Sequence, residues 1–283
     1  MNGVVIGSGY ALVAIGLTLV YGVLRVVNFS HGEVYMFGAY ALVILMSDYH
    51  MGYLLAIVLV IMAGACAGPL IELVAVRPVE KQPRLKTLIT TLGLSVTLSN
   101  LAILIFGASP RFVQAEVTER VLTVADFSIP VHRLIVVCVS SLLVCAVWGF
   151  VKYSLPGKAM RAVAENPGVT QLLGINPRAV VRETFALSTA LAAASGALLS
   201  PLFVVNPFIG TLTGLKAFAV VILGGFGNVQ GAILAGILLG VAESVATGML
   251  GSSYQDTVTF SILALALLVR PRGLISEVQA ENV

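Results

Sequence analysis

The sequence predicts an all-α polytopic membrane protein with eight or nine hydrophobic helical elements, some of them short or broken. Apolar residues make up 58% of the chain and charged residues only 10%. A soluble domain carries about 25% charged residues, so this chain has too little polar surface for water. Its apolar segments also recur at lengths near the roughly 20 residues that cross a bilayer. We therefore treat residues 1–283 as one transmembrane domain, with a cytoplasmic loop at about 152–182.

The apolar segments set the expected order of the helices. They are Gly3–Leu24, Val34–Ser47, Tyr53–Val76, Thr87–Phe106, Arg133–Val151, Val181–Val205, Leu215–Leu223, Gly231–Leu250 and Thr257–Val269. The first lacks a basic leader and a small-residue cleavage site, so we expect it to be a retained span rather than a signal peptide. Residues 215–227 either cross the membrane or re-enter it, which leaves the number of crossings at eight or nine.

Basic residues between the spans predict the orientation of the chain. Three regions are basic: Arg77 to Lys86, Lys152 to Arg182, and Arg270 to Arg272. The segment from Gly107 to Arg133 instead balances its charges, with Arg111, Arg120 and Arg133 against Glu116, Glu119 and Asp126. Because basic loops stay in the cytoplasm, an odd number of crossings gives an external N-terminus and a cytoplasmic C-terminus.

The longest polar segment, residues 152–182, carries the punctuation of short helices. Asn166-Pro167 and Asn176-Pro177 each place an N-cap residue before a proline at the first helical position. Gly174 follows Leu173 where a left-handed residue ends a helix. We expect a brief helix, a glycine stop and a new helix from Asn176. Such a segment either docks a partner or lies in the lipid headgroups.

Small residues predict close helix packing. Gly64 and Gly68, and likewise Gly236 and Gly240, stand four residues apart on one helix face. The three cysteines lie within apolar runs, and we expect them to be buried in packing rather than in a disulfide or metal site: Cys66, Cys138 and Cys145.

Two polar clusters interrupt the apolar pattern. Residues 28–33, NFSHGE, are either a helix break that faces protein or water, or a cytoplasmic turn. Residues 224–228, GGFGN, form the second cluster, and the pairs Asn28/Gly32 and Asn228/Gly231 are compatible with a short internal repeat. The glycines expected at helix breaks or hinges are Gly32, Gly224, Gly225 and Gly227.

Glu243 lies inside its span with no basic residue within one helical turn, so it needs a partner on another helix or a proton. All three aspartates fall in expected loops, which leaves no intramembrane carboxylate pair: Asp48, Asp126 and Asp256. The chain has no H-E-x-x-H motif, and residues 210–216 lack the spacing of a phosphate-binding loop. We expect no catalytic residue, no metal site, no bound cofactor and no ATPase site in this chain.

Three separated segments carry a family resemblance over nearly the whole chain. They are Tyr21–Tyr40, Ala164–Pro177 and Asn206–Glu243. Read together, they resemble the membrane permease of bacterial branched-chain amino acid ABC importers, of the LivH-like type.

The resemblance implies a complex in the bacterial cytoplasmic (inner) membrane. Its expected partners are a second permease in a heterodimer, two cytoplasmic ATPases that use ATP and Mg, and a periplasmic or surface substrate-binding protein, with no nucleic acid. It implies alternating access driven by the ATPases through a coupling segment. The implied coupling residues are Arg161, Ala164, Glu165, Leu173, Gly174 and Ile175. The segment departs from the usual motif at Pro167.

The same resemblance, with the polar groups near the spans, gives the expected substrate pathway: Asn28, Ser30, His31, Asn206 and Glu243. Branched-chain amino acids need an apolar route with few charges, which the spans provide. The alternative is a stand-alone secondary carrier or channel for small amides, urea or amino acids. In that case Glu243 or His31 would be an ion-coupling site.

Overall fold

The computed structural model describes residues 2–80, 82–113, 121–124, 127–269 and 273–274. Its α-helices are α1 (Asn2–Leu24), α2 (His31–Ser47), α3 (Tyr53–Ile71), α4 (Arg84–Phe106), α6 (Val131–Tyr153), α7 (Leu155–Glu165), α8 (Pro167–Leu172), α9 (Pro177–Leu199), α10 (Ile209–Gly224), α11 (Val229–Leu250) and α12 (Gln255–Val269). A π-helical turn (Glu72–Val76) and a 3-10 turn (Arg77–Val79) extend α3, and two more 3-10 turns follow α9 (Ser200–Leu202) and precede α12 (Ser252–Tyr254).

The predicted fold class is confirmed. Within the described residues, seven helical segments are long and apolar enough to cross a membrane, and α10 is a shorter apolar helix. With the 17-residue α2, these make nine elements. Two details differ from expectation. An antiparallel hairpin, β1 (Val121–Val124) with β2 (Phe127–Pro130), lies in the predicted outer loop. The predicted span to Val205 ends as a helix at Leu199, and Val205 pairs with Arg111 instead.

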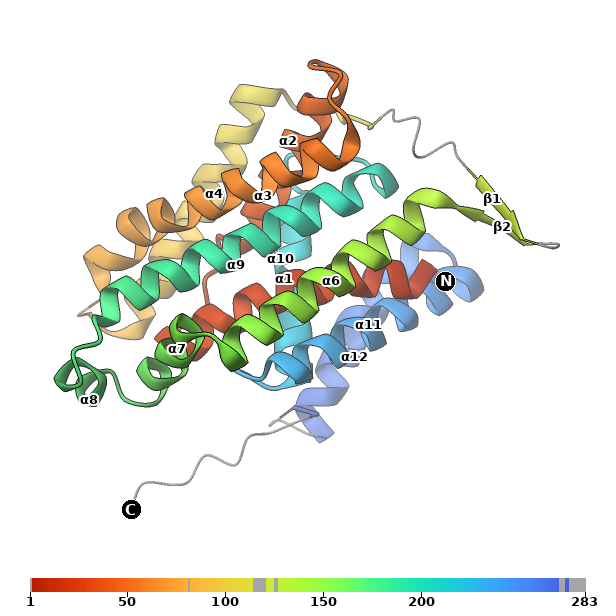
Figure 1. Ribbon diagram of the computed structural model, residues 1–283. Helices are drawn as coiled ribbons and strands as arrows, with labels where there is room; N and C mark the ends of the chain where they lie inside the picture. Colours follow the sequence, from red (N-terminus) through yellow and green to blue (C-terminus); the bar gives the residue numbers. More distant parts are fainter. Residues whose placement is uncertain (1, 81, 114–120, 125–126, 270–272, 275–283) are drawn as a thin grey trace.

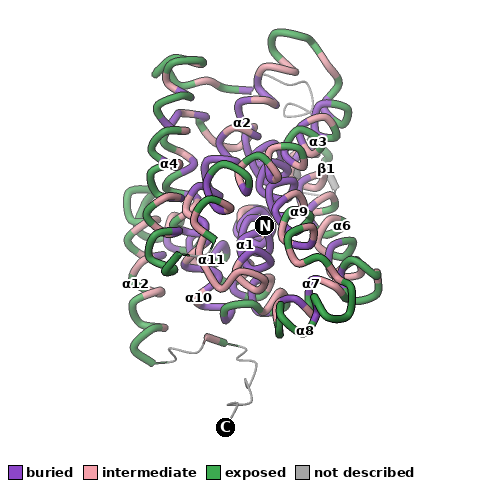
Figure 2. Tube along the Cα trace, turned by 90° about the vertical axis from the view of Figure 1, so that its left-hand side faces the viewer, coloured by how far each residue is buried: buried purple, intermediate pink, exposed green. Residues whose placement is uncertain are grey.

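Helix α1 is the centre of the bundle, enclosed by the helices around it (Figures 1 and 2). In the apolar stretch of α1 that is long enough to cross a membrane, 89% of the residues are buried, whereas in that of α6 only 17% are buried. Glycines permit this enclosure. A side chain at Gly7 would overlap the backbone at Gly236 of α11, and one at Gly16 would overlap the backbone at Ser188 of α9. The predicted close packing through Gly236 and Gly240 therefore joins α11 to α1.

The same small-residue rule holds for α3, where Gly64 and Gly68 pack against α9. The expected burial of the cysteines was wrong, since all three are free but exposed on the outside of the bundle: Cys66, Cys138 and Cys145. In a membrane protein an apolar segment does not show which of its residues are buried and which face lipid, because lipid is as apolar as the protein core.

The two ends of α1 lie on opposite faces of the domain. At its start, the Asn2 side chain accepts a hydrogen bond from Arg133 at the start of α6. At its other end, Tyr21 contacts Phe226, and nearby the Leu274 amide donates to the Leu223 carbonyl. The start of the chain and residue 274 are therefore on opposite faces, as expected for an odd number of crossings. Several residues used for that prediction are outside the described residues: Lys81, Glu116, Glu119, Arg120, Asp126, Arg270 and Arg272.

We predict that Gly240→Ala destabilises the domain, because a methyl group there would overlap the backbone of Gly7. The expected cost is about 1–3 kcal/mol, typical of overpacking. Gly248→Ala on the same helix is the control, since nothing lies within contact distance of a methyl group there. Thermal unfolding of the purified chain in detergent measures both, and equal midpoints would contradict the close α1–α11 contact.

Candidate functional site

The helical structure is interrupted between α1 and α2, and the chain then turns back into the domain. After Leu24, Arg25 takes a left-handed conformation with φ 57°, and six residues later α2 begins at His31. The His31 Nε2 atom lies 3.1 Å from the carbonyl oxygen of Val13. Val13 stands eleven residues from either end of α1 (Asn2–Leu24), or about 16 Å at 1.5 Å per residue. Helix α2 therefore starts at mid-depth, which favours the helix break over the cytoplasmic turn.

Helix α10 starts in the same way from the other side. Asn28 Oδ1 accepts from the Ser30 amide at 3.1 Å, and Asn206 Oδ1 accepts from the Phe208 amide at 2.9 Å. The main-chain carbonyl of each asparagine also accepts a hydrogen bond from the amide three residues later, which belongs to the first residue of α2 or α10. The repeat thus pairs Asn28/Gly32 with Asn206/Gly210. The pairing with Asn228/Gly231 was wrong, because Asn228 instead caps α11 through the Gly231 amide.

The two helix starts touch each other. A side chain at Gly32 would overlap the carbonyl of Gly210, so α2 and α10 meet without an intervening side chain. Glu33 lies at this contact and is fully buried. Its Oε1 atom accepts hydrogen bonds from Ser95 Oγ of α4 and Thr211 Oγ1 of α10, both at 2.9 Å. Helix N-termini favour a negative charge, so the two starts stabilise this carboxylate.

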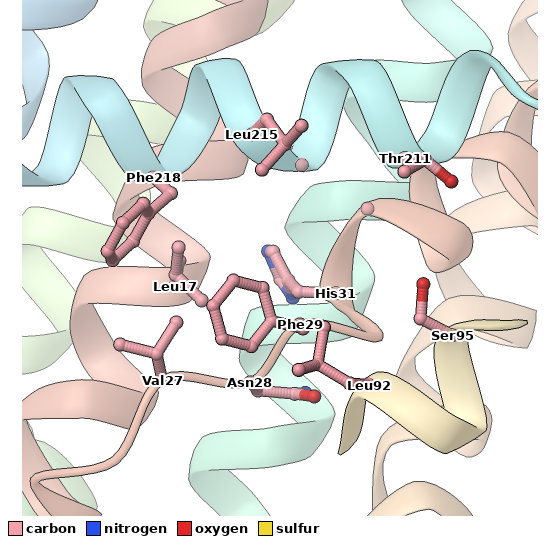
Figure 3. Close-up of a pocket in the computed structure, with 12 residues that line it drawn as sticks. Leu17, Val27, Asn28, Phe29, His31, Leu92, Ser95, Thr211, Leu215 and Phe218 are labelled. Atoms are coloured by element: carbon pink, nitrogen blue, oxygen red, sulfur yellow. The ribbon is translucent and has the colours of Figure 1, made fainter. Parts of the chain in front are cut away.

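A cavity of about 100 Å³ lies beside this contact, between the break, α4 and α10 (Figure 3). It is lined by Leu17, Val27, Asn28, Phe29, His31, Gly32, Leu92, Ser95, Thr211, Gly214, Leu215 and Phe218. Most of this wall is apolar, and two of its polar side chains, Ser95 and Thr211, contact Glu33. His31 offers little to a ligand, because its second ring nitrogen lies 3.4 Å from Ser188 Oγ. The cavity suits a small molecule with an aliphatic body and a polar end.

The five predicted pathway residues do not form one site. Asn28 and His31 line the cavity, and the buried Ser30 hydroxyl donates to Asn28 Oδ1 at 2.7 Å. Asn206 starts α10, and Glu243 belongs to a different cluster. Sequence reasoning missed Glu33, Ser95 and Thr211. Glu33 did carry a signal, as an acidic residue in the first turn of an apolar helix.

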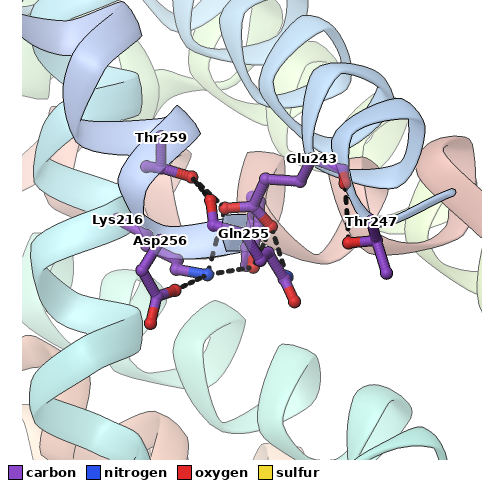
Figure 4. Close-up of polar contacts among 7 residues, drawn as sticks. Lys216, Glu243, Thr247, Gln255, Asp256 and Thr259 are labelled. Atoms are coloured by element: carbon purple, nitrogen blue, oxygen red, sulfur yellow. Dashed lines mark hydrogen bonds and ion pairs between the residues drawn. The ribbon is translucent and has the colours of Figure 1, made fainter. Parts of the chain in front are cut away.

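Glu243 has the partners on other helices that its position requires (Figure 4). Lys216 Nζ of α10 lies 3.0 Å from Glu243 Oε1 and 2.8 Å from Asp256 Oδ1 of α12. The placement of Asp256 in a loop was wrong, since it lies in the first turn of α12. Tyr10 OH and Gln255 Nε2 donate to Glu243 Oε2, at 2.9 and 2.7 Å. The Thr259 hydroxyl donates to its other oxygen. The cluster ties α1, α10, α11 and α12 together.

The polar segment folds as its asparagine caps and glycine stop predicted. Asn166 Oδ1 caps α8, Asn176 Oδ1 caps α9, and Gly174 has φ 81° between them. Leu172 and Leu173 are 88% and 74% exposed, so the turn presents apolar side chains outward.

The other predicted coupling residues lie in α7 or directly after this turn. Arg161 Nη2 donates to the Lys152 carbonyl at 3.1 Å, and Glu165 is exposed at the end of α7. Ile175 packs against a small cluster that includes Met160 and Val163.

The predicted hinge glycines fall into two kinds. Gly225 and Gly227 have φ 99° and 82°, values that favour glycine, in the turn between α10 and α11. Gly224 ends α10 against the backbone of Gly231, and Gly32 lies inside the first turn of α2. These last two glycines permit close approach, and the structure gives them no unusual φ.

Comparison with known proteins matches residues 1–269 to the family described as the permease component of branched-chain amino acid transport systems. The chain belongs to this family. It is 38% identical over 295 residues to the high-affinity branched-chain amino acid transport system permease protein LivH of Escherichia coli K12, covering 100% of this chain and 96% of that protein. Identity to BraD of Pseudomonas aeruginosa, a permease protein of the same description, is 38% with the same coverage.

A second permease of the same description, LivM of Escherichia coli K12, is 25% identical over 94% of this chain and 67% of its own length. The fold is similar to that of PsaBC from Streptococcus pneumoniae, solved in complex with a Fab. The TM-score is 0.51 at 12% identity, covering 96% of this chain and 91% of that one. This chain is thus a multi-pass membrane protein, with seven candidate spans in its described residues.

We predict that Lys216→Met strongly destabilises the domain, because it leaves Glu243 buried without its cation. Removing one partner of a buried ion pair costs about 3–5 kcal/mol. Adding Glu243→Gln should recover part of that loss, since it removes the stranded charge. Thermal unfolding of the single and double variants tests this, and additive losses would contradict the paired arrangement.

Proposed function

We propose that this chain is the membrane permease subunit of an ATP-driven importer for branched-chain amino acids in a bacterial cytoplasmic membrane. Its partners would be a second permease, two cytoplasmic ATPases and a substrate-binding protein. Family membership supports the substrate class. The exposed apolar turn at Leu172 and Leu173 supports a docked cytoplasmic partner, because such side chains cost free energy in water. The chain would bind no ATP itself.

One observation carries the proposal: the coupling segment contacts the start of the break that walls the cavity. Met160 and Val163 of α7 pack with Val23, in the last turn of α1. The Arg25 guanidinium donates to the Ala164 carbonyl at 3.4 Å. A movement of α7 would therefore reach residues 25–30 directly. Closure of the ATPases would shift α7, and the break would open the cavity to one side or the other.

The stand-alone carrier finds no support in the described residues. Glu243 is held by Lys216 and three further donors, and both ring nitrogens of His31 have partners. An ion-coupling carboxylate or imidazole would need to be free to exchange its ion, so neither residue suits that role.

We predict that Leu172→Glu abolishes ATP-driven leucine uptake, because a charge there would have to be buried against the ATPase. Uptake is measured in liposomes that contain this chain, its second permease, the ATPases and the binding protein. The control is Gln82→Glu, which adds the same charge to another exposed cytoplasmic position.

Copurification of the ATPases with each variant reports docking, and copurification of the second permease shows that the chain is still folded. Loss of uptake and of ATPase copurification for Leu172→Glu, with the second permease still bound and the control intact, supports the proposal. Unchanged ATP-driven uptake by Leu172→Glu would contradict the docking assignment, and uptake by this chain alone on an ion gradient would contradict the importer.

A further inference from the structure

We propose that the cavity between the α1–α2 break, α4 and α10 holds a free aliphatic α-amino acid as its zwitterion. Glu33, through Ser95 and Thr211, would receive the ammonium group, and Asn28 would receive the carboxylate. This inference rests on the proposed function and goes further by assigning a role to each end of the ligand.

The assignment of the ammonium group to Glu33 rests on the hydrogen bonds that the Ser95 and Thr211 hydroxyl groups already make. Ser95 and Thr211 both line the cavity and both donate to Glu33 Oε1 at 2.9 Å. Both hydroxyl hydrogens are therefore already used, and each oxygen keeps lone pairs that can accept a hydrogen bond. Within the described residues, Glu33 Oε2 has no hydrogen-bond partner although it is buried. Two acceptors backed by a buried carboxylate fit a cation with several N–H donors.

The carboxylate end follows from an unused donor. Asn28 is 4% exposed and lines the cavity, with its Oδ1 occupied by the amide and hydroxyl of Ser30. In the part of the chain that the structure describes, its Nδ2 group has no acceptor. A buried amide donor without a partner is unfavourable, and a ligand oxygen would supply the missing acceptor. The first turn of α2 at Gly32 adds a favourable dipole for an anion.

The cavity wall determines the size and apolar character of the ligand's side chain. Leu17, Leu92, Leu215 and the rings of Phe29 and Phe218 surround a volume of about 100 Å³ (Figure 3). An apolar cavity of about 150 Å³ binds benzene, so this smaller volume would be filled by a branched side chain of three or four carbon atoms, and the two charged groups of the ligand would lie at its edge against Asn28, Ser95 and Thr211. The described wall presents no charge on that side, so a basic or acidic side chain would be buried without a partner.

The test uses the full chain alone in nanodiscs, without ATP, and a cysteine reporter at the cavity. Leu92→Cys is made in a background where the native cysteines are serine: Cys66, Cys138 and Cys145. Leu92 is 46% exposed and lines the cavity, so a bound ligand should slow its alkylation by a maleimide. The three probes are leucine, 4-methylpentanoate (no ammonium) and 3-methylbutylamine (no carboxylate).

Each variant should weaken the binding of only those ligands that carry the group assigned to the changed residue, the ammonium for Glu33 and the carboxylate for Asn28. Glu33→Gln should raise the half-protecting concentration of leucine roughly tenfold, because it removes the negative charge behind the two hydroxyl groups, and it should not raise that of 4-methylpentanoate. Asn28→Ala should weaken leucine but not 3-methylbutylamine. The unaffected probe shows in each case that the cavity is still folded. The controls Glu183→Gln and Asn100→Ala change exposed residues away from the cavity and should alter nothing.

No protection by leucine, or equal effects of a variant on all three probes, would overturn the proposal and leave Glu33 and Asn28 as structural ties. This result is independent of the proposed function. Intact ATP-driven uptake without protection would overturn only the site. Protection without ATP-driven uptake by the assembled importer would overturn only the proposed function.

Discussion

The contact between the starts of α2 and α10 is the constraint on which the rest of this domain depends. Two helices that begin at mid-depth leave amide groups and irregular backbone away from water, which a membrane protein tolerates only where protein or a cavity receives them. Here the asparagine turns at Asn28 and Asn206 satisfy part of that backbone, and Glu33 bridges the two starts to α4. The contact requires glycine at Gly32 and Gly210, because a methyl group would separate the helices.

This central contact needs a rigid frame, which α1 supplies. Glycines along α1 bring α9 and α11 against its backbone, and the Lys216–Glu243–Asp256 cluster fixes α10, α11 and α12 on another side. The break between α1 and α2 is held from two directions, by His31 on the Val13 carbonyl and by Arg25 on the Ala164 carbonyl. The second of these links it to α7. A rigid bundle with one break tied to a surface helix is an arrangement that can pass movement from that surface to the interior.

Local chemistry made much of the fold predictable from the sequence. Segment length and apolarity gave the spans, and the Asn-Pro pairs and Gly174 gave the ends of α8 and α9. Properties set by contacts between distant segments were not predictable. The exposure of Cys66, the helical position of Asp256 and the match of Asn28 with Asn206 depend on how helices meet. Glu33 was visible as a polar residue, but Ser95 and Thr211 show their role only once α4 and α10 are beside it.

The most direct test of this account is the depth of the break in the membrane. The chain has one tryptophan, so Trp148→Phe with Phe29→Trp places a single fluorophore at the break, and Leu155→Trp in the same background marks the exposed start of α7. Quenching is compared between lipids brominated near the headgroup and lipids brominated near the chain ends. The account predicts stronger quenching of Trp at position 29 by the deep bromines and of Trp at position 155 by the shallow ones. Equal, shallow quenching at both positions would contradict it and make residues 25–30 a cytoplasmic turn.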